Sequence, residues 1–331
     1  MATSSSGIRN RKFLKHIPCN DSENCYFSRM LRIVYAKNKS ENGKRNTERR
    51  LIMSQLAEKV MNRFRLDGKT AVVTGGAGNI GSHGAAAFAE AGADIAIVDL
   101  PVCIDRAKAV AEDLSKKYGV KALAYGCNLT DEKAVAEMFE NIHNDFGHVD
   151  IVHNNAGVGG ALVPDIEEWD SEHDMPHIEH FRQVMDINFM SIYIVAVTAA
   201  RMMKKEGHGG SIINTGSMAA HVVNMGTIFE TMDDASYGSA KAAVLYFTRH
   251  FASQVAEFGI RVNSISPGYC YSPGLHDGLP KETLDLYNNS QPVRRMMDVE
   301  ELQCALLYLA SDASSYCYGT EMLLDGGHTI W

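Results

Sequence analysis

The sequence predicts an α/β fold in which a doubly wound parallel sheet carries helices on both faces, as a single domain. Two observations predict it. Short apolar, β-branched runs alternate along the chain with longer amphipathic runs, which is typical of parallel strands joined by helices. The first strand, 69–74, passes through a glycine-rich turn, 75–81, directly into a helix-forming run, 82–91. In such sheets ligands bind beyond the carboxyl ends of the strands.

The glycine-rich turn has the pattern of a dinucleotide-binding fingerprint. A second apolar strand, 94–98, follows the first helix and ends in an acid, Asp99, at the spacing that the fingerprint requires. Glycine lets the backbone approach a pyrophosphate closely, and the free N–H groups at the start of the helix bind its charge. The predicted phosphate-binding residues are Gly75, Gly78, Asn79, Ile80 and Gly81. The alternative is a turn that only permits close packing of helix on strand.

Asp99 predicts the choice of cofactor. Its carboxylate can accept hydrogen bonds from both ribose hydroxyls of an adenosine, and it would repel a 2′-phosphate. No Arg or Lys lies in 75–81, and Arg106 is the first basic residue after Asp99. We therefore expect NAD(H) rather than NADP(H).

The rest of the chain continues the alternation. Gly119 and Gly259 end two of the helices, and Thr130 is placed to cap another. Further strands are predicted at 121–125, 149–153, 210–214, 260–265 and 322–324. Further helices are predicted at 107–118, 133–146, 181–203, 237–257 and 302–309, with a short helix around 175–181 in the long acidic connection 158–180.

The first part of the chain differs in composition from the remainder. Residues 1–65 hold 15 Lys and Arg against 5 Asp and Glu, a balance of +10, so the rest of a chain of net charge −8 must carry −18. Residues 1–52 are basic and without periodicity, which fits a disordered extension, a mitochondrial transit peptide, or a segment upstream of a start at Met53. We expect a cytoplasmic protein, or a mitochondrial one if 1–50 is a transit peptide. The catalytic domain is then 53–331.

Composition excludes several classes of protein. No apolar run reaches the roughly 18 residues that span a bilayer, so we expect no membrane partner. Seven cysteines without a CxxC pair indicate a reducing compartment rather than a disulfide framework or a zinc site. The acidic domain gives no reason to expect nucleic acid. His173, His177 and His180 could suggest a metal site, but a solvated acidic loop explains them more simply, and we expect no metal.

Four residues form a candidate catalytic group. Tyr237 and Lys241 are four apart in a predicted helix and therefore share a face. An ammonium one turn from a phenol lowers the pKa of the phenol towards neutrality and makes it usable as an acid or base. Ser217 follows the strand 210–214 and can bind a substrate oxygen, and Asn188 can hold a water near Lys241.

In the order and at the spacing in which they stand, these motifs resemble the short-chain dehydrogenase/reductase family. The resemblance covers about 67–331 and includes Asn154-Asn155-Ala156-Gly157, Pro267-Gly268 and Asp325-Gly326-Gly327. It implies a Rossmann-like fold. It implies the following roles: Tyr237 as acid/base, Lys241 on the nicotinamide ribose, Ser217 on the substrate oxygen, Asn188 in a proton relay, Asn155, Ala156 and Gly157 near the adenosine ribose, and Pro267 and Gly268 at the nicotinamide. Asn128, next to Leu129, stands where the family usually contacts adenine, although a turn cap is equally plausible.

The chain departs from the family pattern in two places. Asn79 stands where the compact branch of the family usually has glycine, which gives the turn a spacing like that of the extended branch, the nucleotide-sugar epimerases. We keep the compact branch, because the Asn-Asn-Ala-Gly motif is present and only a short C-terminal part follows Pro267. Twenty positions separate Ser217 from Tyr237, more than is usual, and the extra residues fall within 221–234.

The predicted activity is NAD(H)-dependent interconversion of a secondary alcohol and a ketone. The run from Asn263 to Tyr269 resembles members of the family that act on sugar alcohols and ketoses. A substrate lid at about 269–297 contains Leu275, Leu286 and Tyr287, so a lipid-like or steroid ketone stays open. A non-catalytic NAD-binding regulator is a further alternative. The two long helices, 181–203 and 237–257, are apolar on more than one face and predict a homodimer or homotetramer.

Overall fold

The computed structural model describes residues 59–159, 169–170, 175–223 and 235–331. The predicted extension 1–52 lies outside these residues, as do most of the inserted residues 221–234. The compact unit that contains the sheet spans Val60–Trp331.

A seven-stranded parallel sheet forms the centre of this unit, in the order β3-β2-β1-β4-β7-β8-β9. The strands are β1 (Thr70–Thr74), β2 (Asp94–Asp99), β3 (Ala122–Gly126), β4 (Ile151–Asn154), β7 (Gly210–Thr215), β8 (Ile260–Pro267) and β9 (Glu321–Leu324). The strand order reverses between β1 and β4, and a ligand crevice is expected at such a reversal. The prediction of a doubly wound parallel sheet is confirmed.

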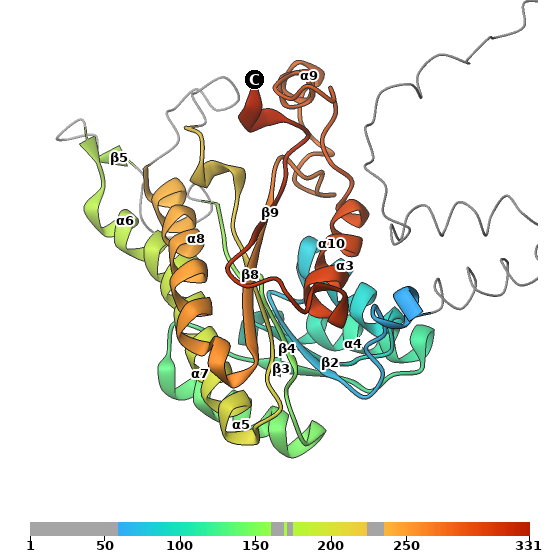
Figure 1. Cartoon of the computed structure of the whole chain (residues 1–331). Helices are drawn as coiled ribbons and strands as arrows, with labels where there is room; N and C mark the ends of the chain where they lie inside the picture. Colours follow the sequence, from blue (N-terminus) through green and yellow to red (C-terminus); the bar gives the residue numbers. More distant parts are fainter. Residues whose placement is uncertain (1–58, 160–168, 171–174, 224–234) are drawn as a thin grey trace, which may run out of the picture. The chain divides into compact units, whose positions relative to one another are not determined.

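Helices cover both faces of the sheet (Figure 1). One layer contains α3 (Asn79–Glu90), α4 (Ile104–Tyr118) and α10 (Gln303–Ala310), and the other contains α5 (Glu132–Phe146), α7 (Ser191–Glu206) and α8 (Ala235–Val255). Two apolar cores result. Phe88 and Leu306 are fully buried in the first, and Phe139 and Met203 are fully buried in the second.

Local sequence sets most helix ends. Gly119 and Gly259 close α4 and the turn after α8 with φ of 72° and 73°, a left-handed conformation that glycine adopts without strain. The prediction that Thr130 caps α5 is wrong. Asp131 is the cap, because its carboxylate accepts hydrogen bonds from the N–H groups of Lys133 and Ala134.

The predicted helix 181–203 is longer and is not uniform. It runs from α6 (Ile178–Met185) through a π-helical segment, Asp186–Met190, into α7. By length and composition alone this 29-residue helix could cross a membrane, but half of its most apolar stretch is buried inside the protein. It is a helix of the core layer.

The connection before α6 differs from the prediction. Two short antiparallel strands, β5 (Trp169–Asp170) and β6 (Met175–Pro176), stand where the sequence predicts an acidic loop and a short helix. His180 is fully buried in α6, so it is not part of a solvated loop. The acidic composition of this connection did not indicate the local strand pair that forms there.

The predicted lid contains one helix, α9 (Lys281–Asn289). Tyr287 on α9 is buried, whereas Leu275 and Leu286 are largely exposed. Figure 1 shows α9 beside the end of the chain, and His328 contacts the carbonyl oxygen of Ser290 through its Nδ1 at 2.7 Å.

Candidate active site

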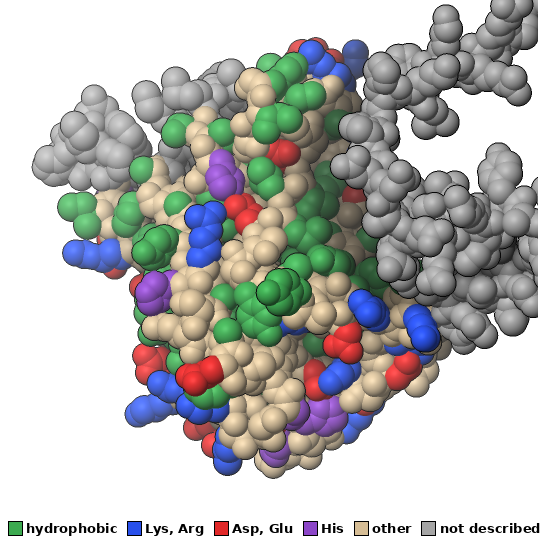
Figure 2. All heavy atoms as spheres, viewed as in Figure 1, with side chains coloured by type: hydrophobic (Ala, Val, Ile, Leu, Met, Phe, Trp, Pro, Cys, Tyr) green, Lys and Arg blue, Asp and Glu red, His purple; other side chains and the backbone are tan. Residues whose placement is uncertain are grey.

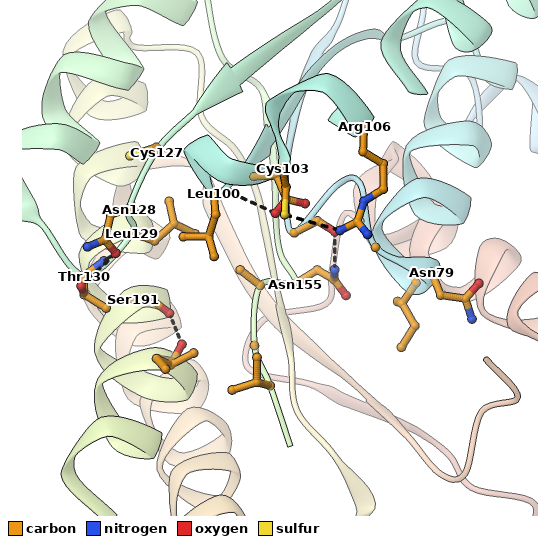
Figure 3. Close-up of a pocket in the computed structure, with 18 of the residues that line it drawn as sticks. Asn79, Leu100, Cys103, Arg106, Cys127, Asn128, Leu129, Thr130, Asn155 and Ser191 are labelled. Atoms are coloured by element: carbon orange, nitrogen blue, oxygen red, sulfur yellow. Dashed lines mark hydrogen bonds between the residues drawn. The ribbon is translucent and has the colours of Figure 1, made fainter. Parts of the chain in front are cut away.

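A cavity of about 890 Å³ opens where the strand order reverses. Figure 3 shows most of its lining residues. They come from the turn after β1, the end of β2 and the segment after it, the segments after β3 and β4, the helix that carries Asn188, and the lid. Ten of the predicted cofactor residues line it: Gly75, Gly78, Asn79, Ile80, Asp99, Asn128, Leu129, Asn155, Ala156 and Gly157. The volume is within the range of about 300–1,000 Å³ that small-ligand sites occupy.

The backbone of the turn 75–81 packs so tightly that Gly75 and Gly81 have no room for a side chain. Gly75 has φ 61°, and a Cβ there would lie 2.9 Å from the Cα of Ala156. A Cβ on Gly81 would lie 2.2 Å from the carbonyl oxygen of Gly75, which no real side chain permits. The hydroxyl of Thr74 accepts hydrogen bonds from the N–H groups of Asn155 and Ala156, which ties the turn to the end of β4. These two glycines are therefore required for close packing of the turn on itself and on the end of β4, and Gly75 and Gly78 of this turn also line the cavity.

Asp99 lies at the end of β2 in the cavity wall. Its Oδ2 accepts a hydrogen bond from the N–H of Ala77 at 3.0 Å, and its Oδ1 accepts one from Leu100 at 2.9 Å. Both oxygens are therefore fixed in position, and each keeps a lone pair for a ligand.

Arg106 also lines the cavity, beside Cys103 (Figure 3). Its guanidinium lies 3.7 Å from the sulfur of Cys103. Arg106 is seven positions after Asp99, so the sequence did not indicate that it would lie near a bound cofactor. It reaches the cavity because α4 begins at Ile104 and turns the third residue of the helix back towards β2.

Asn128 and Leu129 form the opposite wall. Asn128 Oδ1 accepts hydrogen bonds from the N–H and hydroxyl of Thr130 at 3.2 and 3.0 Å. The side chain thus makes the turn that the sequence analysis considered, and it faces the cavity as well. Leu129 is almost fully buried and supplies an apolar surface.

Lys241 and Tyr237 lie one turn apart on α8, as predicted. The ammonium of Lys241 is 5.5 Å from the centre of the Tyr237 ring and donates a hydrogen bond to the carbonyl oxygen of Thr215 at 3.0 Å. The side chain of Lys241 is 3% exposed. Burial lowers the pKa of Lys241 to about 8, because the interior disfavours the charged form. The ring distance shows that Lys241 points towards Tyr237. With a pKa of about 8, its ammonium remains largely protonated at pH 7.

Asn188 lies in the π-helical segment and joins this group. Its Nδ2 donates to the carbonyl oxygen of Val184, and its Oδ1 accepts from the N–H of Val158 at 3.1 Å. Gly157 fits between Asn188 and Lys241, since a Cβ there would lie 2.7 Å from Asn188 Oδ1 and 3.5 Å from Lys241 Nζ. One extra residue per turn is common where a helix meets a functional site.

Ser217 follows β7 and begins a short 3₁₀ turn, Met218–Ala220. Its hydroxyl oxygen accepts a hydrogen bond from the N–H of Ala219 at 3.1 Å, which fixes the oxygen and leaves the hydroxyl proton free to donate.

Five of the predicted cofactor residues are not part of the cavity lining: Gly81, Tyr237, Lys241, Pro267 and Gly268. Pro267 ends β8, and the N–H of Gly268 donates to the carbonyl oxygen of Leu324 on β9 at 2.8 Å. A Cβ on Gly268 would lie 2.7 Å from the Cα of Asp325, so this glycine is required for the close approach of two chain segments. The candidate catalytic residues Tyr237 and Lys241 therefore lie outside the lining of the cavity.

Comparisons with known proteins agree with this geometry. The family model described as enoyl-(acyl carrier protein) reductase matches residues 75–329. A probable NADP-dependent mannitol dehydrogenase of Yarrowia lipolytica is 39% identical over 83% of this chain and 92% of that protein. The sorbose reductase SOU1 of Candida albicans is also 39% identical, over 83% of this chain and 92% of its own length.

The chain belongs to the short-chain dehydrogenase/reductase family. A crystal structure of a short-chain type dehydrogenase/reductase from Mycobacterium marinum is 35% identical, with a TM-score of 0.71 over 82% of this chain and 99% of that one. As a member of the family, this protein is an oxidoreductase of the alcohol/ketone type that uses a nicotinamide cofactor.

Proposed function

We propose that this short-chain dehydrogenase/reductase interconverts a sugar alcohol and a ketose with NAD(H). The observation that carries the proposal is the buried ammonium of Lys241 against the ring of Tyr237, in a chain whose glycine-rich turn and Asp99 line a cavity of about 890 Å³. A bound nicotinamide would supply or accept the hydride.

The protein's own residues handle the proton and the orientation. The hydroxyl of Tyr237 gives a proton to the substrate oxygen in reduction and takes it back in oxidation. The positive charge of Lys241 stabilises the phenolate form of Tyr237, and the carbonyl oxygen of Thr215 holds that charge in place. Ser217 donates a hydrogen bond to the same substrate oxygen. Asn188, beside Gly157 and Lys241, continues the proton path.

The proposed cofactor is NAD(H) rather than NADP(H). Support comes from Asp99, whose two oxygens are fixed by Ala77 and Leu100 at the end of β2, where a 2′-phosphate would meet a negative charge. Two observations favour NADP(H) instead. Arg106 is a basic residue in the cavity lining, and the Yarrowia relative is named as NADP-dependent. We place Asp99 first because a fixed carboxylate cannot move out of the way of a phosphate.

The proposed substrate class is a polyol and its ketose. Support comes from the mannitol and sorbose relatives at 39% identity and from their coverage of nearly the whole catalytic unit.

A substrate panel tests the proposal. Oxidation of NADH is followed against hexuloses, pentuloses and apolar cyclic ketones. We expect kcat/KM for the best ketose to exceed that for every apolar ketone by about tenfold or more, a difference of about 1.4 kcal/mol. A higher kcat/KM for the apolar ketones would show that the substrate is an apolar ketone and not a ketose. Binding of NADH without turnover of any ketone would indicate a regulator.

A further inference from the structure

Asn79 makes a contact that the glycine usual at its position could not make. Its Nδ2 donates a hydrogen bond at 3.0 Å to the carbonyl oxygen of Tyr271. Asn79 is the first residue of α3, directly after the turn, and Tyr271 belongs to the lid 269–297. The bond therefore joins two segments that are 192 residues apart in the chain.

Asn79 and the chain on either side of Tyr271 lie in the wall of the cavity. Asn79 lines it, and so do Cys270 and Ser272, the two neighbours of Tyr271. In Figure 3 Asn79 lies at one end of the lining residues, apart from Asn128 and Ser191 at the other. The hydrogen bond is thus made where the phosphate-binding turn meets the lid.

The lid segment around Tyr271 is locally well connected. The N–H of Tyr271 donates to the carbonyl oxygen of Met297 at 2.9 Å, and the Tyr271 hydroxyl binds the carboxylate of Asp277. The ring of Tyr271 stacks on His276 at 5.5 Å, and His276 is buried against Tyr287 of α9. A displacement of the Tyr271 backbone would therefore be passed on to α9.

We propose that Asn79 is a positioning residue that couples the dinucleotide-binding turn to the substrate lid. Filling the turn fixes the start of α3, and the amide of Asn79 then holds the lid at Tyr271. The inference rests on the proposed function for the identity of the lid's ligand. The mechanical link between turn and lid is independent of which ketone is bound. Because coupling between two sites is reciprocal, a liganded lid must also strengthen cofactor binding through the same bond.

The variant Asn79→Gly tests the link and installs the residue that the family usually has. Hydrogen exchange of the full chain is measured with and without NADH. In the wild type we expect NADH to slow exchange in 270–289, and in Asn79→Gly we expect this slowing to disappear. The turn keeps its own backbone contacts in the variant, and by reciprocity the Kd for NADH should rise by no more than about the same factor as KM. KM for the best ketose should rise about fivefold, as expected for one lost hydrogen bond, with kcat little changed.

Two further variants serve as controls. Asn79→Gln keeps an amide donor on a longer side chain and should restore part of the protection. Ser82→Ala removes a neighbouring hydroxyl whose bond, to the carbonyl oxygen of Asn79 at 3.1 Å, stays within α3. It should behave as the wild type.

The outcomes separate this inference from the proposed function. If Asn79→Gly keeps the NADH-induced protection of 270–289, the coupling role is refuted, whatever the substrate. A change in the Kd for NADH with unchanged lid protection would make Asn79 a cofactor ligand only and would also overturn the inference. If no ketose is turned over, the proposed function fails, and the exchange measurement still decides the role of Asn79.

Discussion

At the scale of single residues, Asp99 and Arg106 give the adenosine end of the cavity two opposed charges. Asp99 is fixed by two backbone N–H groups, whereas the guanidinium of Arg106 has the sulfur of Cys103 at 3.7 Å. A carboxylate held by two hydrogen bonds resists displacement more strongly than a cation beside a thiol. We therefore expect Asp99 to govern recognition of the ribose, and Arg106 to contribute to cofactor binding mainly when Asp99 is replaced.

Substitutions at the two positions test this ranking. We expect the wild type to prefer NADH over NADPH by about tenfold or more in kcat/KM. Asp99→Ser should reduce that preference to near unity, because the repulsion of a 2′-phosphate is removed. Arg106→Ala should leave kcat/KM for NADH within about twofold and should lower the NADPH activity of the Asp99→Ser background. Steady-state kinetics with both cofactors checks this, and a wild-type preference for NADPH would contradict the ranking.

Some residues of the site can be predicted from the sequence and others cannot. Asp99 is predictable because its spacing from the glycines has a fixed chemical meaning. Arg106 is missed because its relevance depends on where α4 begins. Thr74 and Thr215 are missed because they act through a buried hydroxyl and a backbone carbonyl, for which composition gives no signal.

At the scale of elements, α8 carries a buried charge at a cost to stability. The pKa of Lys241 is about 8 in the folded protein, against 10.5 for a free lysine side chain. Between these values the unfolded chain binds the proton that the folded chain releases, so stability rises with pH across that window. Below pH 8 the full cost of desolvating the ammonium is present.

Replacing the ammonium should therefore stabilise the helix layer while it abolishes activity. For Lys241→Met in the absence of cofactor we expect a Tm at pH 7 equal to or above that of the wild type. The gain is bounded by about 3 kcal/mol and reduced by loss of the bond to Thr215. The difference should shrink between pH 8 and 10. Lys205→Met, at an exposed position of α7, is the control. A large fall in the Tm of Lys241→Met at both pH 7 and pH 10 would contradict the description of Lys241 as a desolvated cation.

Element boundaries show where local sequence is sufficient. Glycines at 119 and 259 end their helices as predicted, because the left-handed conformation is a property of the residue itself. The π-helical segment Asp186–Met190 and the strand pair β5–β6 were not predicted. In the π-helical segment Asn188 accepts a hydrogen bond from Val158, a tertiary contact that no local pattern contains, whereas β5 and β6 pair only with each other in a stretch whose composition gave no strand signal.

At the scale of the whole molecule, exposed aromatic side chains lie on the helices that the sequence predicts to pair between subunits. Figure 2 shows acidic and basic side chains interspersed on one face, with hydrophobic side chains gathered over its middle. On the long helices that the sequence analysis selected for pairing, Phe181, Tyr193 and Tyr246 are 36%, 41% and 70% exposed. Exposed aromatic side chains on adjacent helices are typical of a surface that another subunit covers.

We therefore expect a homodimer or homotetramer, with a mass two or four times that of the 36.3 kDa chain. Light scattering after gel filtration measures it directly. Tyr246→Lys should shift the mass downwards, since a buried ammonium would oppose the contact. A wild-type mass equal to one chain at micromolar concentration would refute the expectation.

The order and direction of the strands were predictable from the sequence as a whole, because alternation and right-handed crossovers leave few arrangements. The particular segments that meet were not, such as the approach of Gly75 to Ala156, of Gly157 to Asn188 and of Gly268 to Asp325.

The proposed interconversion of alcohol and ketone depends most directly on the phenol of Tyr237, as the group that exchanges a proton with the substrate. Single-turnover and steady-state oxidation of NADH by Tyr237→Phe with the best ketose, alongside titration of NADH binding, tests it. We predict that kcat falls by about 10²-fold or more while the Kd for NADH stays within about twofold of the wild type. Turnover within about tenfold of the wild type would contradict the assignment of Tyr237 as the acid/base.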